Sequence, residues 1–222
     1  MPSRVSEHTP VYDTSVFINC PYDRKYLPLF RAIVFAVHDC GFVARAAAAS
    51  EDSSEVRITK IVEMTRGSRY GIHDISRIEL SRGTGYPRFN MPLELGIFLG
   101  AKEFGDSDQQ RKECLVLDRE PRRYQAFVSD LAGQDIRSHG DGEHGAIEAI
   151  RNFFSTKQPG RILPGPSRMT ARYDAFKAAL PAAARKYHLK VSELGFYEYR
   201  EMVLAFLKAN PWNVPKTRKR RS

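Results

Sequence analysis

Short runs of β-branched and aromatic residues alternate with segments of helical periodicity over the first 157 residues, and this alternation constrains the fold more than any other feature. The runs that predict strands lie at residues 16–18, 42–44, 70–75 and 114–118. Apolar residues recur at helical spacing in residues 26–39, 56–64, 91–101, 124–131 and 145–154. Strands that alternate with helices favour right-handed crossovers. The sequence therefore predicts an α/β fold with an open, mostly parallel sheet flanked by helices.

The last third of the chain differs in composition from the rest. Residues 159–166 (PGRILPGP) predict a linker, and helices are expected at residues 169–190 and 192–209, the second opening with Ser192 as N-cap. Residues 158–222 carry 14 Lys/Arg against 4 Asp/Glu, whereas residues 1–157 carry 21 against 22. We therefore expect an α/β domain over residues 1–157. A basic helical appendage with a basic tail is expected over residues 158–222.

Composition and patterning exclude several classes of protein. No stretch approaches the roughly 18 consecutive apolar residues of a membrane span, and the first ten residues contain no apolar signal segment. Cys20, Cys40 and Cys114 are too few and too scattered for a disulfide framework or a zinc site. The expectation is a soluble, cytoplasmic protein with reduced cysteines, no metal and no membrane contact.

Glu94 is the most informative residue. It is the only charged residue between Arg88 and Lys102, on a predicted helix whose other residues are largely apolar. A carboxylate buried there needs hydrogen bonds or a function, and burial would raise its pKa. An alternative is that Glu94 caps its own helix, where a negative charge favours the dipole. Gly96 and Gly100 are expected to let the helix approach the sheet closely.

Asp74 and Ser76 follow a predicted parallel strand at its carboxyl end, and ligands of open α/β sheets bind beyond such ends. The long connection at residues 76–90 is of the kind that often carries function. The alternative for Asp74 is that it caps the next turn. His73 points to the opposite face from Asp74, and we interpret it as a structural histidine.

A second polar group follows the first strand and faces the same edge of the sheet. Asn19, Tyr22 and Asp23 could hold a ribose or a base there, although the segment is also compatible with ordinary turn chemistry. Cys20 has no local base partner, so a thiolate nucleophile is not expected.

Three of these motifs carry a family resemblance. They are the run VFIN at residues 16–19 followed by Asp23, the tripeptide DIS at residues 74–76, and NMPLELG at residues 90–96. Together they resemble the bacterial TIR-like nucleotide-binding proteins and the related nucleoside 2-deoxyribosyltransferases, over roughly residues 12–157. Two features depart from the TIR pattern. The tryptophan that often precedes the glutamate is absent, and residues 44–54 are Ala-rich.

The resemblance implies a flavodoxin-like sheet and a glutamate that acts at the ribosyl carbon of an N-glycosidic bond. Carried over residue by residue, Glu94 is the expected catalytic group, Asp74 the expected contact to base or ribose, and Asn19 and Asp23 the expected pocket lining. The other predicted substrate contacts lie in the same loops and are Tyr22, Ser76, Arg88 and Asn90.

The function expected on this basis is cleavage of the nicotinamide–ribose bond, with NAD as substrate and no separate cofactor. The resemblance further implies bacterial antiphage defence and activity in an assembled state, as a homo-oligomer or with a defence partner. The apolar positions of the last helix make the appendage a candidate for assembly.

Two alternatives remain open from the sequence. One is a different enzyme at the same site, a nucleoside deoxyribosyltransferase or a nucleotide N-glycosidase. The other is a non-catalytic nucleotide-sensing module whose basic C-terminus contacts nucleic acid through residues 216–221. A simply solvated tail would account for the same charge.

Overall fold

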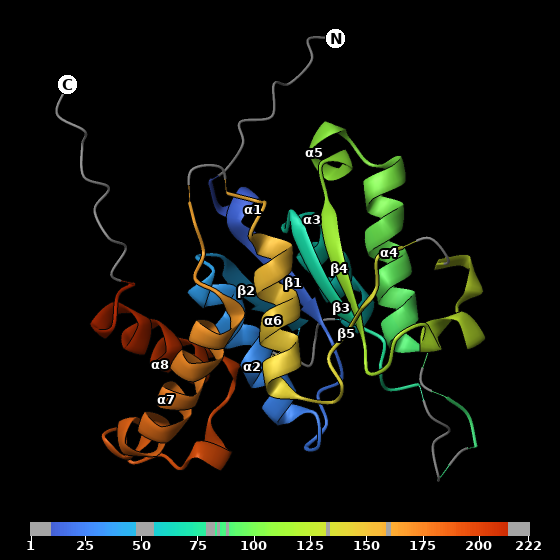
Figure 1. Cartoon of the computed structure of the whole chain (residues 1–222). Coiled ribbons are helices and arrows are strands. Elements are labelled where there is room, and N and C mark those ends of the chain that lie inside the picture. The colour runs from blue at the N-terminus through green and yellow to red at the C-terminus, as the bar shows by residue number, and fades with distance from the viewer. Residues whose placement is uncertain are drawn as a thin grey trace, which may run out of the picture.

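A computed structural model of the chain describes residues 10–47, 56–78, 83, 85–87, 89–131, 134–158 and 161–212. The strands of this part of the chain are β1 (Ser15–Asn19), β2 (Val43–Ala46), β3 (Tyr70–Asp74), β4 (Glu113–Asp118) and β5 (Arg137–Ser138). The helices are α1 (Pro10–Thr14), α2 (Leu27–Asp39), α3 (Arg57–Arg66), α4 (Asn90–Phe104), α5 (Ser107–Gln110), α6 (Glu143–Phe154), α7 (Pro166–Arg185) and α8 (Phe196–Ala209). Figure 1 shows their arrangement.

The five strands form one sheet in the order β2-β1-β3-β4-β5, and every pair is parallel. This order confirms the predicted open α/β sheet and is that of flavodoxin-like folds. Because all strands run the same way, their carboxyl ends lie at one edge of the sheet, the lower edge in Figure 1. Asn19 of β1 pairs in register with His73 of β3, and Asp74 pairs with Leu117 of β4.

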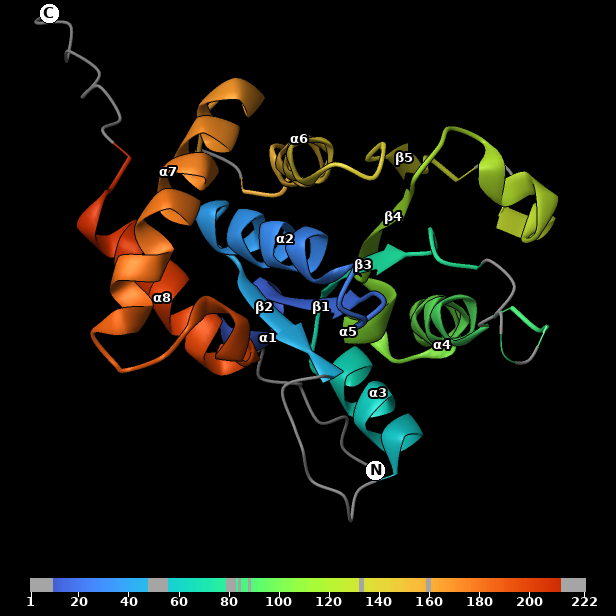
Figure 2. The same cartoon turned by 90° about the horizontal axis from the view of Figure 1, so that it is seen from below.

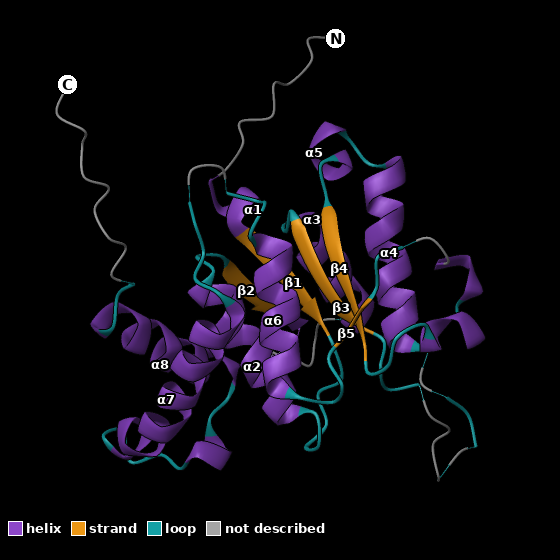
Figure 3. Ribbon diagram, viewed as in Figure 1, coloured by secondary structure: helices purple, strands orange, loops and turns teal. Residues whose placement is uncertain are grey.

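Helices cover both faces of the sheet, because the strands carry apolar residues that must be buried on each side. All five residues of β1 and all five of β3 are buried, which is the pattern of parallel strands with a helix layer on each side. Figure 2 shows α2 and α6 on one face and α3 and α4 on the other, and Figure 3 shows the strands enclosed between them. The polar residues at the strand ends are therefore held on a rigid, buried frame.

Two local predictions are wrong. Residues 124–131 do not form one helix but two short 3-10 helices, Arg123–Ala126 and Ser129–Leu131, because Phe127 between them has a non-helical φ of −138°. Ser192 does not cap the last helix. It lies in the 3-10 helix Val191–Glu193, and α8 starts after Gly195, whose N–H donates to the Glu198 carboxylate.

The C-terminal helices pack on the α2–α6 face and share its core. Phe176 of α7 stacks on Phe35 of α2, and Tyr199 of α8 donates a hydrogen bond to the carbonyl of Arg31. Beyond α8, Trp212 donates its Nε1–H to Asp39 at 3.0 Å. The division at residue 157 remains a prediction, and the apolar contacts across it are continuous.

Parts of the predicted chemistry lie outside the described residues. These are Arg88 and the basic tail at residues 216–221. Within the part of the chain that the structure describes, no helix is both long and apolar enough to cross a membrane.

Candidate functional site

The site is built at the carboxyl edge of the sheet, where β1, β3 and α4 meet. Asn19 ends β1 and is fully buried. Its Nδ2 donates to the carbonyl oxygen of Met91 on α4 and to Nδ1 of His73 on β3, both at 3.0 Å. Asn19 therefore ties the two strands to the first turn of α4, and its Oδ1 has no hydrogen-bond partner among the described residues.

His73 is buried between aromatic rings and carries no charge at neutral pH. Burial and the nearby Lys112 ammonium lower its pKa to about 3. Its ring packs edge-on against Phe17 and Phe98. This environment agrees with the interpretation of His73 as a structural residue.

Asp74 is fully buried and its carboxylate is surrounded by donors. Tyr26 donates its hydroxyl to Oδ2, and the backbone N–H of Ser76 donates to Oδ1 at 2.8 Å. Nε2 of His139 lies 3.0 Å from Oδ2. The Nδ1 of that histidine accepts the N–H of Asp141, whereas Nε2 contacts Asp74 without the alignment of a hydrogen bond. The expected contact of Asp74 to a base or ribose remains a prediction. In this structure its carboxylate connects β3 with the start of α2 and the segment after β5, and we call this group of contacts the Asp74 clamp.

Ser76 belongs to the same clamp. Its carbonyl oxygen accepts from Nη2 of Arg123 at 2.8 Å, and Arg123 in turn forms an ion pair with the buried Asp118 at the end of β4. Its Oγ is buried and has no hydrogen-bond partner among the described residues. Only this hydroxyl of Ser76 is left for a ligand.

Glu94 occupies a different environment, in the second turn of α4. Its side chain is 3% exposed, and Oε1 lies 3.3 Å from Nη2 of Arg57 at the start of α3. Burial raises the pKa of Glu94, and the Arg57 guanidinium opposes that rise. No hydrogen bond to its own helix is found among the described contacts, so capping does not account for this carboxylate. Its Oε2 remains available to a ligand.

Tyr22 and Cys20 lie near Glu94. The Tyr22 hydroxyl donates to the carbonyl of Ile18 at 3.0 Å. Burial raises the pKa of both side chains, and the negative charge of Glu94 adds to each rise. The negative charge of Asp74 also raises the pKa of Cys20, so the buried thiol stays protonated. This is consistent with the expectation that Cys20 is not a nucleophile.

The remaining predicted contacts are more peripheral. Asp23 is exposed, and its Oδ1 accepts the N–H groups of Lys25 and Tyr26 in the turn that starts α2. Asn90 is the exposed first residue of α4. The structure thus links Asn19 to the α4 turn that precedes Glu94 and places Tyr22 within the electrostatic reach of Glu94, whereas Asp23 serves the adjacent turn. A ligand role for Asp23 or Asn90 remains a prediction.

Sequence reasoning missed three residues of this region. Tyr26 and His139 hold Asp74, and Arg57 holds Glu94. None of them stands in a motif. Each comes from a segment distant in the chain, so only the folded topology reveals the pairing.

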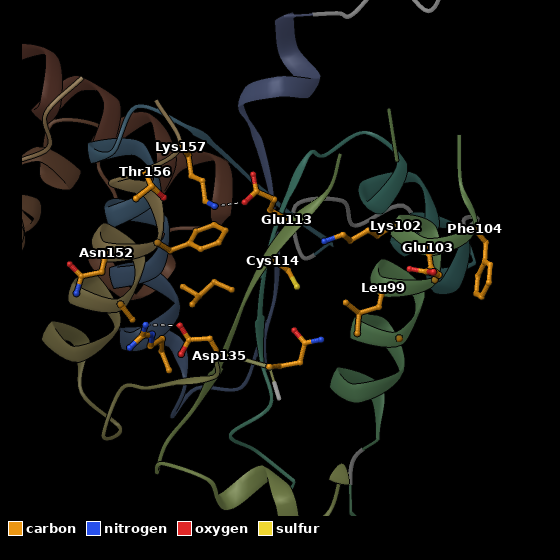
Figure 4. Close-up of a pocket in the computed structure, with 17 residues that line it drawn as sticks. Leu99, Lys102, Glu103, Phe104, Glu113, Cys114, Asp135, Asn152, Thr156 and Lys157 are labelled. Atoms are coloured by element: carbon orange, nitrogen blue, oxygen red, sulfur yellow. Dashed lines mark hydrogen bonds and ion pairs between the residues drawn. The ribbon is translucent and has the colours of Figure 1, made fainter. Parts of the chain in front are cut away.

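A large hollow lies elsewhere, along the outer side of β4 between α4 and α6 (Figure 4). It has a volume of about 860 Å³, and Figure 4 shows Leu99 and Lys102 on one side of it and Asn152 and Lys157 on the other. Gly96 and Gly100 line it, and a Cβ added to either would meet nothing within 4 Å. The expected close approach of these glycines to the sheet is therefore wrong, because β5 is only two residues long and leaves this edge open. None of the predicted site residues lines the hollow.

In comparisons with known proteins, no protein-family model and no curated protein matches this chain. A function can therefore be inferred only from the geometry of the site. Among the described residues, no group of three or more His, Cys, Asp or Glu side chains could hold a metal ion. The chemistry available at the carboxyl edge, within the described part of the chain, is that of carboxylates, amides, hydroxyls, imidazoles and the guanidinium groups of Arg57 and Arg123.

Proposed function

We propose that this protein hydrolyses the N-glycosidic bond between nicotinamide and ribose in NAD. The observation that carries the proposal is Glu94, a nearly fully buried carboxylate at the ligand-binding edge of a flavodoxin-like sheet, whose charged partner among the described residues is one half-exposed arginine. A carboxylate in this position costs folding free energy that a merely structural role does not repay.

Nicotinamide is a cationic leaving group, so its departure needs no strong general acid. As the C1′–N bond breaks, its electron pair neutralises the pyridinium and positive charge develops on the ribose. The Glu94 carboxylate would bind the ribose hydroxyls and stabilise this oxocarbenium-like charge. Water then bonds to C1′ and releases a proton, giving ADP-ribose and nicotinamide. Stabilisation of this kind can supply roughly 3–4 kcal/mol.

The neighbours of Glu94 support its role. Arg57 favours the ionised form that the reaction needs, while burial keeps water from screening the carboxylate. Asn19 adds an unpartnered buried amide oxygen at the end of β1, able to accept from a ribose hydroxyl or from the nicotinamide amide.

The test is product analysis with purified protein. Wild type incubated with NAD should release nicotinamide and ADP-ribose, and Glu94→Gln should not. Release of a free base from other nucleotides, or exchange of a base between nucleosides, with NAD left intact, would overturn the proposal in favour of a nucleotide N-glycosidase or a deoxyribosyltransferase.

The proposal extends to assembly and to a role in antiphage defence, both carried by the family resemblance. An apolar groove of about 600 Å³ between α7 and α8 leaves Tyr187 and Tyr197 largely exposed, which fits a surface that associates. If assembly activates the enzyme, its specific activity should rise with protein concentration, in parallel with the mass measured by light scattering. Constant specific activity across that rise in mass would contradict this extension.

A further inference from the structure

The ion pair that holds Glu94 is strongly asymmetric. The Arg57 side chain is 55% exposed, whereas that of Glu94 is 3% exposed. Arg57 is the first residue of α3, and its guanidinium is the solvent-exposed member of the pair. A ribose that contacts Glu94 must therefore lie next to the guanidinium.

Arg57 has hydrogen-bonding capacity to spare. A guanidinium offers five N–H donors in a planar fork, and among the described residues Arg57 makes one hydrogen bond, from Nη2 to Glu94. The geometry of that fork matches a phosphate group, which it can bind through two parallel hydrogen bonds. In a nucleotide the 5′-phosphate is attached to the same ribose whose C1′ reacts, so both groups would lie within one side chain's reach.

The start of α3 is suited to an anion. The first turn of α3 contains no acidic residue, and Val56 at its N-cap provides no side-chain acceptor. The positive end of the helix dipole is thus uncompensated by α3's own side chains.

We propose that Arg57 binds the phosphate next to the scissile ribose, so that the substrate class is nucleotides and dinucleotides rather than nucleosides. This inference rests on the proposed function, because it takes Glu94 as the group on the ribose. When the phosphate engages the fork, the guanidinium shares its charge between two anions and the Glu94 carboxylate is freed toward the ribose hydroxyls.

The test compares NAD with nicotinamide riboside, which has the same scissile bond and no phosphate. Wild type should prefer NAD by about 10- to 100-fold in kcat/KM, the value of charge-assisted hydrogen bonds to one phosphate. Arg57→Gln should abolish most of this preference, chiefly by raising KM for NAD. Arg57→Lys, which keeps the charge and loses the fork, should fall between. An unchanged NAD preference in Arg57→Gln would overturn the inference.

The ratio of the two substrates is the informative readout. Arg57→Gln leaves Glu94 without its charge partner, which slows both reactions alike and cancels in the ratio. Arg66→Gln is the matched control, since Arg66 is exposed at the other end of the same helix, about 14 Å away at 1.5 Å per residue. It should leave the ratio at the wild-type value.

A binding measurement separates this inference from the proposed hydrolysis. In the Glu94→Gln background, calorimetry should show NAD binding about 10- to 100-fold more tightly than nicotinamide riboside, with the difference lost on adding Arg57→Gln. If that holds and wild type releases no nicotinamide, the hydrolysis fails and Arg57 keeps its role. If NAD is cleaved but the two ligands bind equally, the hydrolysis stands and the role of Arg57 is refuted.

Discussion

Asp74 and Glu94 are two buried carboxylates at the same edge of one sheet, and their surroundings are opposite. Asp74 faces a tyrosine hydroxyl, a backbone N–H and a histidine Nε2, all on buried groups. Within the described part of the chain, Glu94 has one charged partner, Arg57, whose side chain is half-exposed. Burial alone therefore does not mark a functional carboxylate. A carboxylate that stabilises the fold has several buried hydrogen-bond partners, whereas one that acts on a ligand keeps an oxygen without such a partner.

The largest expected effect on stability belongs to Asp74. Asp74→Ala leaves the Tyr26 hydroxyl and the Ser76 N–H buried without an acceptor and removes the carboxylate beside His139, which should cost about 3–5 kcal/mol of unfolding free energy. Urea denaturation measures this. Asp135→Ala, which removes an exposed ion pair with Arg137, is the control and should cost at most about 1 kcal/mol. A loss of unfolding free energy for Asp74→Ala as small as that of the control would mean that the contacts of Asp74 do not stabilise the fold.

Tyr26→Phe should show a smaller loss in the same clamp. It removes only the hydroxyl that donates to Asp74, so the expected cost is about 1.5–3 kcal/mol. Tyr197→Phe, at a half-exposed position of α8, should change the free energy of unfolding by less than about 0.5 kcal/mol. Equal effects of the two substitutions would remove the evidence for a clamp at Asp74.

Asp39 extends the comparison to the C-terminal helices. It is held by Arg172 at 3.2 Å and by Trp212, the sole tryptophan, while burial raises its pKa to about 6. We expect Trp212 fluorescence and far-UV circular dichroism to give the same urea midpoint, because the appendage shares the α2 core. An earlier fluorescence transition would show that residues 158–212 unfold as a unit of their own.

The smallest expected effect is on the stability of Glu94→Gln. Since burial raises the pKa of Glu94 above its usual 4.5, the folded protein binds a proton more tightly than the unfolded chain. Wild type therefore loses stability as the pH rises from about 4.5 through the higher folded pKa, and the glutamine variant does not. In thermal melts from pH 4 to pH 8, the melting temperature of the variant relative to that of wild type should rise with pH. A variant that is less stable at pH 7 would place Glu94 with Asp74 among the structural carboxylates.

Much of the sheet could be predicted from sequence because its central strands are runs such as residues 16–18 and 114–118, bounded by polar or turn residues. The sequence analysis did not predict β5 and α5, which are short and polar. β5 consists of Arg137 and Ser138, and α5 is a four-residue helix. Periodicity has no power over so few residues. Their consequence is large, however, since the brevity of β5 opens the hollow beside β4.

The residues of the candidate site likewise fall into those that the sequence predicts and those that it does not. Glu94, Asp74 and Asn19 could be singled out because a lone charge in an apolar helix and polar residues at strand ends are local patterns. The partners could not be predicted, because Arg57, Tyr26 and His139 become neighbours of the carboxylates only through the order of the strands. Those partners are what distinguishes Asp74 from Glu94.

The most direct test of this account is the rate of nicotinamide release from NAD by Glu94→Gln, measured beside Glu103→Gln, an exposed glutamate on the same helix. The account predicts that Glu94→Gln lowers kcat by at least about two to three powers of ten with unchanged circular dichroism, while Glu103→Gln keeps the wild-type rate. Nicotinamide release by Glu94→Gln at the wild-type rate would contradict it.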